Sequence, residues 1–256
     1  MAVVENIRSK SVRDQVSAEE WQTRVDLAAT YRLIAHYGWD DLIYTHLSAR
    51  VPGPEHHFLL NPYGMMFDEI TASSLVKVDL DGEIVMESPY GVNAAGFTIH
   101  SAVHAEGKDA HCVIHTHSYD GVAVSAQEEG LLPLSQTAMI LLEDMAYHDY
   151  EGIALDLDER ERLVRDLGEK HSMILRNHGL LSTGANCADA FVRHFFLERA
   201  CTMQVRALSG GVKLNMPNQG VPEKTAGQAN SLEGMGALPW PALLRKLDRI
   251  DPSYRD

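Results

Sequence analysis

The chain has few cysteines and no long apolar run, and each shortage excludes a class of protein. Cysteine occurs three times in 256 residues, an odd number without C-x-x-C spacing. This predicts reduced thiols in a cytoplasmic protein rather than a disulfide framework. No apolar stretch approaches the roughly 20 residues that cross a bilayer. Residues 1–10 carry charges and lack the apolar segment of a signal peptide, so we expect neither export nor membrane association.

Basic residues are also in short supply. The 22 lysines and arginines face 36 aspartates and glutamates, which gives a net charge of −14. An acidic surface repels a phosphate backbone, so nucleic acid is not an expected partner. The length suits one domain of generous size, and 45% hydrophobic residues are enough for its core.

Histidine, in contrast, is frequent, and two histidines close a short apolar run. Cys112–Ile114 leads directly into His115, Thr116 and His117. In a β-strand, residues i and i+2 point to the same side, close enough for both imidazoles to hold one cation. The pattern predicts half of a metal site where a buried strand meets solvent.

A third histidine stands in the same kind of place. Met173–Leu175 is another apolar run, and His178 follows it, 61 residues after His117. Three neutral imidazoles with open positions are typical of a catalytic divalent metal rather than a closed structural one. From these residues alone, the alternative stays open that His115 and His117 are strand-end histidines bonded to backbone groups.

The pattern of helices and strands predicts the fold class. Apolar periodicity predicts helices over about 17–37, 95–107, 156–170 and 186–208, a short helix over 72–75, another beginning near Tyr119, and one over 241–250. Strands are expected over 42–51, 58–60, 76–78, 83–85, 112–117 and 173–178, with a hairpin at Asp81-Gly82. This irregular mixture favours an α/β sandwich with a mostly antiparallel or mixed central sheet over a doubly wound fold.

Composition divides the chain into three parts. Residues 1–16 form an N-terminal extension, and 17–209 form one domain. From Gly210 onward the sequence turns to Gly, Pro, Asn and Gln, which predicts a tail over 210–256 with one short helix.

Four ordered motifs between about Trp21 and Leu208 resemble the class II aldolase/adducin family, typified by L-fuculose-1-phosphate aldolases. They are Tyr44–Arg50, Asn61–Gly64, Gly96–His117 and Arg176–Leu180. The resemblance implies a three-layer α/β/α sandwich and a homotetramer with active sites at subunit interfaces. It also implies one divalent ion per chain on His115, His117 and His178, with zinc favoured over manganese or iron.

The chain departs from the aldolase pattern at the acid/base position. Where the aldolases carry a glutamate, 19 residues before the first metal histidine, this chain has Gly96. Glycine offers neither oxygen nor proton, so the proton transfer of a fuculose-type cleavage cannot run through it.

Phosphate-binding positions depart as well. Ala94 and Ala95 replace two serines, Tyr63 replaces a threonine, and His46 replaces an asparagine. Charge-assisted hydrogen bonds contribute about 1.5–3 kcal/mol each, so losing several removes most affinity for a phosphate dianion. We therefore expect a small, non-phosphorylated substrate, carboxylated or aromatic.

The remaining chemistry leaves several functions open. We favour a metal-dependent carbon–carbon lyase, with decarboxylation ahead of retro-aldol cleavage because loss of carbon dioxide needs no base to begin. Relatives in the family keep two alternatives open: an Fe(II)-dependent oxygenase acting on an aromatic 2-oxo or 2-hydroxy acid, and a non-catalytic adducin-like scaffold.

The expected site surrounds the three metal histidines. Tyr150 and His46 are the catalytic candidates, and the substrate-binding candidates are Asn61, Tyr63, Gly64 and Asn93. His100 is interpreted as a hydrogen-bonded residue on a helix face near the site, His148 as a solvated loop residue, and Gly179 as a turn glycine without chemistry.

Overall fold

The computed structural model describes residues 11–107, 109–152, 157–229 and 234–256. Within them, seven strands form one sheet in the order β3-β2-β1-β4-β7-β6-β5. The strands are β1 (His46–Arg50), β2 (Phe58–Leu60), β3 (Val76–Val78), β4 (Cys112–Thr116), β5 (Met145–His148), β6 (Ser172–Leu175) and β7 (Gly179–Gly184). β5 and β6 pair in parallel and all other neighbours are antiparallel, which confirms the expected mixed sheet.

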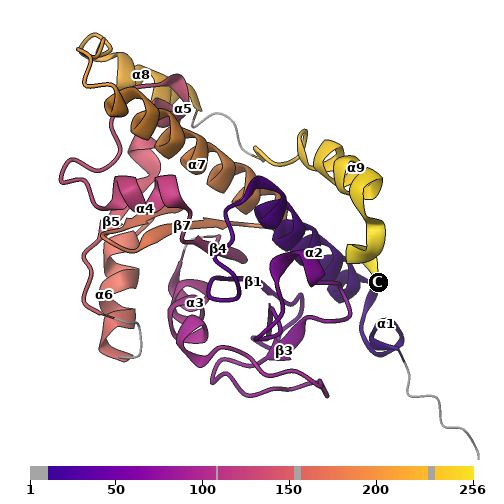
Figure 1. Cartoon of the computed structure of the whole chain (residues 1–256). Helices are drawn as coiled ribbons and strands as arrows, with labels where there is room; N and C mark the ends of the chain where they lie inside the picture. The colour runs from indigo at the N-terminus through magenta and orange to yellow at the C-terminus, as the bar shows by residue number, and fades with distance from the viewer. Residues whose placement is uncertain (1–10, 108, 153–156, 230–233) are drawn as a thin grey trace, which may run out of the picture.

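Helices cover both faces of the sheet, which gives the three layers (Figure 1). The described α-helices are α1 (Val12–Gln15), α2 (Ala18–Tyr37), α3 (Ala94–Glu106), α4 (Tyr119–Ser125), α5 (Gln136–Leu141), α6 (Leu157–Leu167), α7 (Cys187–Ser209), α8 (Val221–Ala229) and α9 (Trp240–Ile250). Three 3₁₀ turns, η1 (Phe67–Glu69), η2 (Leu142–Asp144) and η3 (Pro252–Arg255), complete the elements. None of the helices in these described ranges is both long and apolar enough to cross a membrane.

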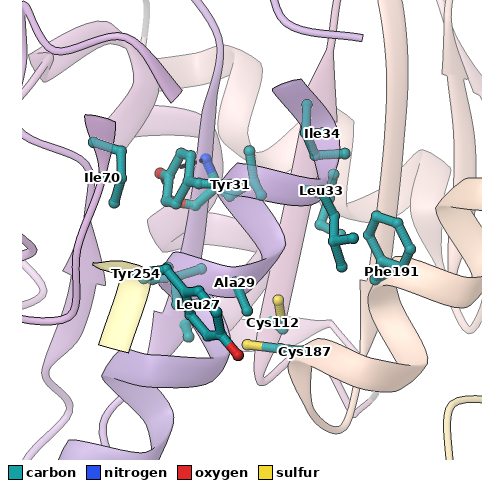
Figure 2. Close-up of a cluster of buried hydrophobic side chains, with 14 of the residues drawn as sticks. Leu27, Ala29, Tyr31, Leu33, Ile34, Ile70, Cys112, Cys187, Phe191 and Tyr254 are labelled. Atoms are coloured by element: carbon teal, nitrogen blue, oxygen red, sulfur yellow. Dashed lines mark hydrogen bonds between the residues drawn. The ribbon is translucent and has the colours of Figure 1, made fainter. Parts of the chain in front are cut away.

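The core is divided between the two faces by the alternation of β4. Cys112 and Ile114 pack into a cluster with α2, α7 and α9, whereas Val113 packs into a cluster with α3 and α6. Figure 2 shows part of the first cluster, in which α2 side chains meet Cys112 of β4 and Cys187 and Phe191 of α7. This same alternation determines which way the histidines at the end of β4 point.

Helix α2 begins and ends where the sequence predicts. The Ser17 hydroxyl accepts the backbone N–H of Glu20 at 3.1 Å, which satisfies one of the free N–H groups of the first turn. Gly38 ends the helix with φ of 70°, a conformation that glycine adopts without strain.

Several boundaries differ from the predictions. β1 begins at His46 rather than at residue 42, because Leu42 has a positive φ of 51° that breaks the strand. Residues 72–74 form turns and not a helix. The Asp81-Gly82 hairpin is present, but its second arm is reduced to one bridge between Val78 and Ile84.

The segment after Gly210 contains more structure than one helix. α8 was not predicted, whereas α9 matches the predicted helix over 241–250. Trp240 and Tyr254 are buried in the first core cluster, and the Trp240 indole donates a hydrogen bond to Asp26 of α2 at 3.2 Å. The end of the chain is therefore packed against the domain.

Candidate metal centre

One edge of the sheet carries the candidate ligands. β4 ends at Thr116, so His115 and His117 stand at this edge. The turn between β6 and β7 holds His178, and β7 pairs with β4 so that Leu180 lies opposite Thr116. Antiparallel pairing brings the end of one strand beside the start of the next, and this brings histidines 61 residues apart together.

The three imidazoles converge on one point. One nitrogen of each ring, from His115, His117 and His178, lies within 4.8 Å of the others. The ring centroids are 4.7 Å apart for His115 and His117, and 4.8 Å apart for each of these with His178. Among the described residues, no other group of three or more histidine, cysteine or acidic side chains has the geometry of a metal site.

In His115 and His117, hydrogen bonds determine which ring nitrogen carries the lone pair. His115 donates from Nδ1 to the Leu180 carbonyl at 3.0 Å, and His117 donates from Nδ1 to the Asp41 carboxylate at 3.1 Å. Because these oxygens can only accept, each neutral ring keeps its lone pair on Nε2. The two Nε2 atoms are 3.0 Å apart. At this distance a proton or a cation can lie between the two nitrogens, and a cation bound by both satisfies each lone pair, so the donor set fits a metal.

The environment of His115 and His178 keeps these two rings neutral. Burial, together with the neighbouring His117, lowers the pKa of His178 to about 4. Burial, reinforced by His178 and His117, lowers the pKa of His115 well below its ordinary value. Neutral imidazole is the form that binds a metal, and three such ligands leave positions open for substrate.

A glycine allows the two strands to approach at the site. A Cβ on Gly179 would lie 2.3 Å from the Thr116 carbonyl oxygen, which no side chain tolerates. The positive φ in this turn belongs to Asn177, at 55°, and not to Gly179. The interpretation of Gly179 as the turn glycine was therefore wrong: it is the first residue of β7, and its missing side chain brings His178 within reach of β4.

A second group of histidines, His100 and His104, lies beside the first and is hydrogen-bonded to Ser48. The Ser48 hydroxyl bonds His104 Nε2 at 2.6 Å and His100 Nδ1 at 2.5 Å. His104 Nδ1 donates to the Ala110 carbonyl at 2.6 Å, so its Nε2 accepts from Ser48, and Ser48 in turn accepts from His100. This matches the interpretation of His100 as a hydrogen-bonded residue on a helix face.

His46 lies between the two groups. Its ring centroid is 4.5 Å from that of His100 and 5.5 Å from that of His115. The side chain is buried, with an exposed fraction of 7%. The structure thus places this catalytic candidate against the metal centre, on the inner side of His115.

The β5 end of the same edge brings two further residues to His178. Tyr150 has its ring centroid 6.0 Å from that of His178 and is half exposed. His148 is buried in β5, and its Nδ1 bonds Asp166 of α6 at 2.8 Å. The prediction of a solvated loop for His148 was wrong, because β5 is only four residues long and gave no clear alternation.

Three of the four substrate-binding candidates, Asn61, Tyr63 and Gly64, follow β2 at this edge. Asn61 is buried and accepts a hydrogen bond from the Tyr31 hydroxyl at 3.0 Å. Tyr63 is half exposed, and Gly64 has a positive φ of 103°. Asn93 is half-buried just before α3. β1 separates β2 from β4, so this loop stands about 10 Å from the metal ligands across two strand spacings.

The sequence reasoning missed residues that hold the ligands. Asp41 bonds His117 across 76 residues of sequence, and nothing in its local pattern predicts that contact. His194 and Glu198, buried on α7, contact Thr116 next to His117. Their spacing of four residues on an otherwise apolar helix face was the available signal.

The comparison with protein families gives one match. The model of the "Class II Aldolase and Adducin N-terminal domain" matches residues 25–205. A protein of Caulobacter vibrioides described as a class 2 aldolase protein is 60% identical over 96% of both chains. Alpha-adducin of Mus musculus is 42% identical over 89% of this chain, which spans 33% of alpha-adducin.

Two solved structures show the same fold. An aldolase II superfamily protein from Pseudomonas syringae superimposes with a TM-score of 0.92 at 54% identity, covering 96% of this chain and all of the other. L-fuculose 1-phosphate aldolase from Glaciozyma antarctica superimposes with a TM-score of 0.80 at 25% identity, covering 93% and 94%.

Proposed function

We propose that this chain, which belongs to the class II aldolase and adducin family, is a metal-dependent carbon–carbon lyase. Its substrate would be a small non-phosphorylated molecule, carboxylated or aromatic. Decarboxylation is favoured over retro-aldol cleavage. We further propose a homotetramer with sites at subunit interfaces, one divalent ion per chain, and zinc before manganese or iron as that ion.

One observation carries the proposal: three imidazoles present nitrogens to a common point, and the Nδ1 atoms of His115 and His117 are occupied elsewhere. A divalent ion there would polarise substrate oxygens and stabilise the negative charge that develops as a carbon–carbon bond breaks. A non-catalytic scaffold has no need to hold the Nε2 atoms of His115 and His117 3.0 Å apart.

The residues near the ligands support decarboxylation. The position of the aldolase glutamate is Gly96, at the start of α3, so a retro-aldol reaction lacks its usual group to accept the substrate hydroxyl proton. Loss of carbon dioxide needs a proton only afterwards, at carbon. Tyr150 stands beside His178 with about half of its side chain exposed, and we propose it as that donor.

The proposal that the substrate carries no phosphate group rests on two residues of the pocket. His46 and Tyr63 occupy positions at which the aldolases resembled by this chain hold phosphate. His46 is buried against His115, and Tyr63 is half exposed on the loop after β2. An imidazole and a phenol in place of small donors offer ring faces and hydrogen-bond donors that suit a planar, aromatic or carboxylated substrate.

Metal analysis and product detection test the proposal together. The purified chain should contain close to one divalent ion, and His178→Ala should lose it. Incubation with panels of hydroxylated aromatic acids and aldols should release carbon dioxide or an aldehyde without consuming oxygen. Oxygen uptake would favour the oxygenase instead, and a chain that binds no divalent ion would overturn the lyase.

A scaffold role is the second candidate, favoured by the 42% identity to alpha-adducin. The two functions separate by metal dependence. A scaffold keeps its assembly state and partners after His178→Ala, whereas the lyase loses turnover with its metal.

A further inference from the structure

The residues flanking His117 point away from the metal and into the α7 layer. Side chains alternate along β4, so Thr116 faces the side opposite to His115 and His117. Thr116 is fully buried there, and Ser118 is buried just beyond the strand end.

Both hydroxyls meet one buried carboxylate. Glu198 of α7, with 1% of its surface exposed, accepts the Thr116 hydroxyl on Oε1 at 2.9 Å and the Ser118 hydroxyl on Oε2 at 2.6 Å. His117 is thus bracketed by two bonds that run to the two oxygens of the same side chain. Ser118 also accepts the backbone N–H of Gly121, which caps α4.

A histidine completes the network. His194 Nε2 lies 3.0 Å from the Thr116 hydroxyl and 3.3 Å from Glu198 Oε1. Because the Thr116 hydrogen goes to Glu198, the Thr116 oxygen accepts from His194 Nε2, and His194 Nδ1 accepts from the Ser182 hydroxyl at 3.1 Å.

A buried carboxylate is costly unless its oxygens are satisfied. Here each oxygen of Glu198 receives a hydroxyl, and the donors are the two neighbours of one candidate ligand. Charge-assisted O–H···O⁻ bonds are short and directional, so they restrict the backbone on either side of His117.

We propose that Glu198 is a positioning residue that holds His117 at the metal centre through Thr116 and Ser118. The proposal rests on the metal centre of the proposed function. It extends the support of His117 to both sides of the sheet, since Asp41 holds the imidazole and Glu198 holds the main chain that carries it.

Glu198→Gln tests this role, because it keeps the side-chain volume but replaces one acceptor oxygen by a donor. Its matched control is Ser182→Ala, which removes a hydroxyl from the far end of the same network without touching the neighbours of His117. The full-length proteins are titrated with Co²⁺, and the visible spectrum of the bound ion is recorded. In the metal-free proteins, amide hydrogen exchange is measured at His117 and Ser118.

Glu198→Gln should raise the Co²⁺ dissociation constant by about 10- to 100-fold, the usual effect of removing an outer partner of a metal ligand. It should also change the Co²⁺ spectrum and accelerate exchange at His117 and Ser118, while Ser182→Ala leaves all three unchanged. If Glu198→Gln fails to fold, Thr116→Val, which keeps the side-chain shape, should show the same changes to a smaller degree.

The outcomes separate the two proposals. A wild-type chain that binds no Co²⁺ overturns the metal centre and with it this role. A wild-type chain that binds Co²⁺, combined with a folded Glu198→Gln protein of unchanged affinity and spectrum, overturns the positioning role alone.

Discussion

The metal-centre histidines and His104 of α3 lie on the same face of one sheet and differ in what their ring nitrogens contact. His115 and His117 each donate Nδ1–H to an oxygen, a carbonyl and a carboxylate, and their Nε2 atoms face each other at 3.0 Å. His104 uses both nitrogens, on a carbonyl and on Ser48. The first arrangement leaves Nε2 of each ring directed at a common point, whereas both nitrogens of His104 are bonded within the protein.

Burial does not separate the two groups. His115 and His104 are both buried, and burial is the first cause that lowers the pKa of each, to about 4 for His104. Both are therefore neutral near pH 7. The comparison teaches that the partner of the second nitrogen, more than burial or charge, distinguishes a ligand from a core histidine.

The largest expected effect compares equivalent substitutions in the two groups. His178→Gln should weaken Co²⁺ binding by more than about 100-fold, since loss of even an outer partner costs about 10–100-fold. His104→Gln should leave the affinity unchanged, because its nitrogens are already bonded to Ser48 and Ala110. Competition titration measures both constants. An equal loss of Co²⁺ affinity in the two variants would show that His104 does not differ from the candidate ligands in this way.

Gly179 tests how closely β7 must approach β4 for the ligands to meet. Gly179→Ala should lower the free energy of unfolding by about 1–3 kcal/mol, because the new Cβ overlaps the Thr116 carbonyl. It should weaken metal binding as well. Gly227→Ala is the control: this helical glycine has open space around it and should gain about 0.5–1 kcal/mol. Urea unfolding measures the free energy of unfolding of both variants. A Gly179→Ala protein as stable as the wild type would contradict the close approach of β7 to β4.

The most gradual expected effect is a pH dependence that comes from His104. Its pKa is about 4 in the folded chain against an ordinary value of 6.5, so the unfolded chain binds the proton first as pH falls. Its contribution to stability is complete above pH 6.5 and is lost between about pH 6.5 and 4, at up to about 1.4 kcal/mol per pH unit. Urea unfolding across this range should give a shallower slope for His104→Gln. His56→Gln, at an exposed site, should keep the wild-type slope.

Local sequence was a good guide where an element had a strong pattern. The caps of α2, the apolar run of β4 and the long helix α7 lie close to their predicted positions. β5 and β7 were missed for physical reasons. β7 reads Gly-Leu-Leu-Ser-Thr-Gly and is buried throughout, so it shows neither alternation nor strand-forming composition. β5 has four residues, too few for a period to emerge.

The sequence by itself predicted that His115 and His117 face the same side, because i and i+2 on a strand must do so and an apolar run predicts the strand. It also determined the mixed α/β fold and, through its family motifs, the missing acid/base residue at Gly96. Only the tertiary structure decided which histidines have their nitrogens occupied, and that Asp41 and Glu198 hold His117 from opposite sides. The contacts of Asp41 and Glu198 join residues 76 or more positions apart. No local pattern encodes them, since only strand pairing and helix packing bring such groups into hydrogen-bond distance.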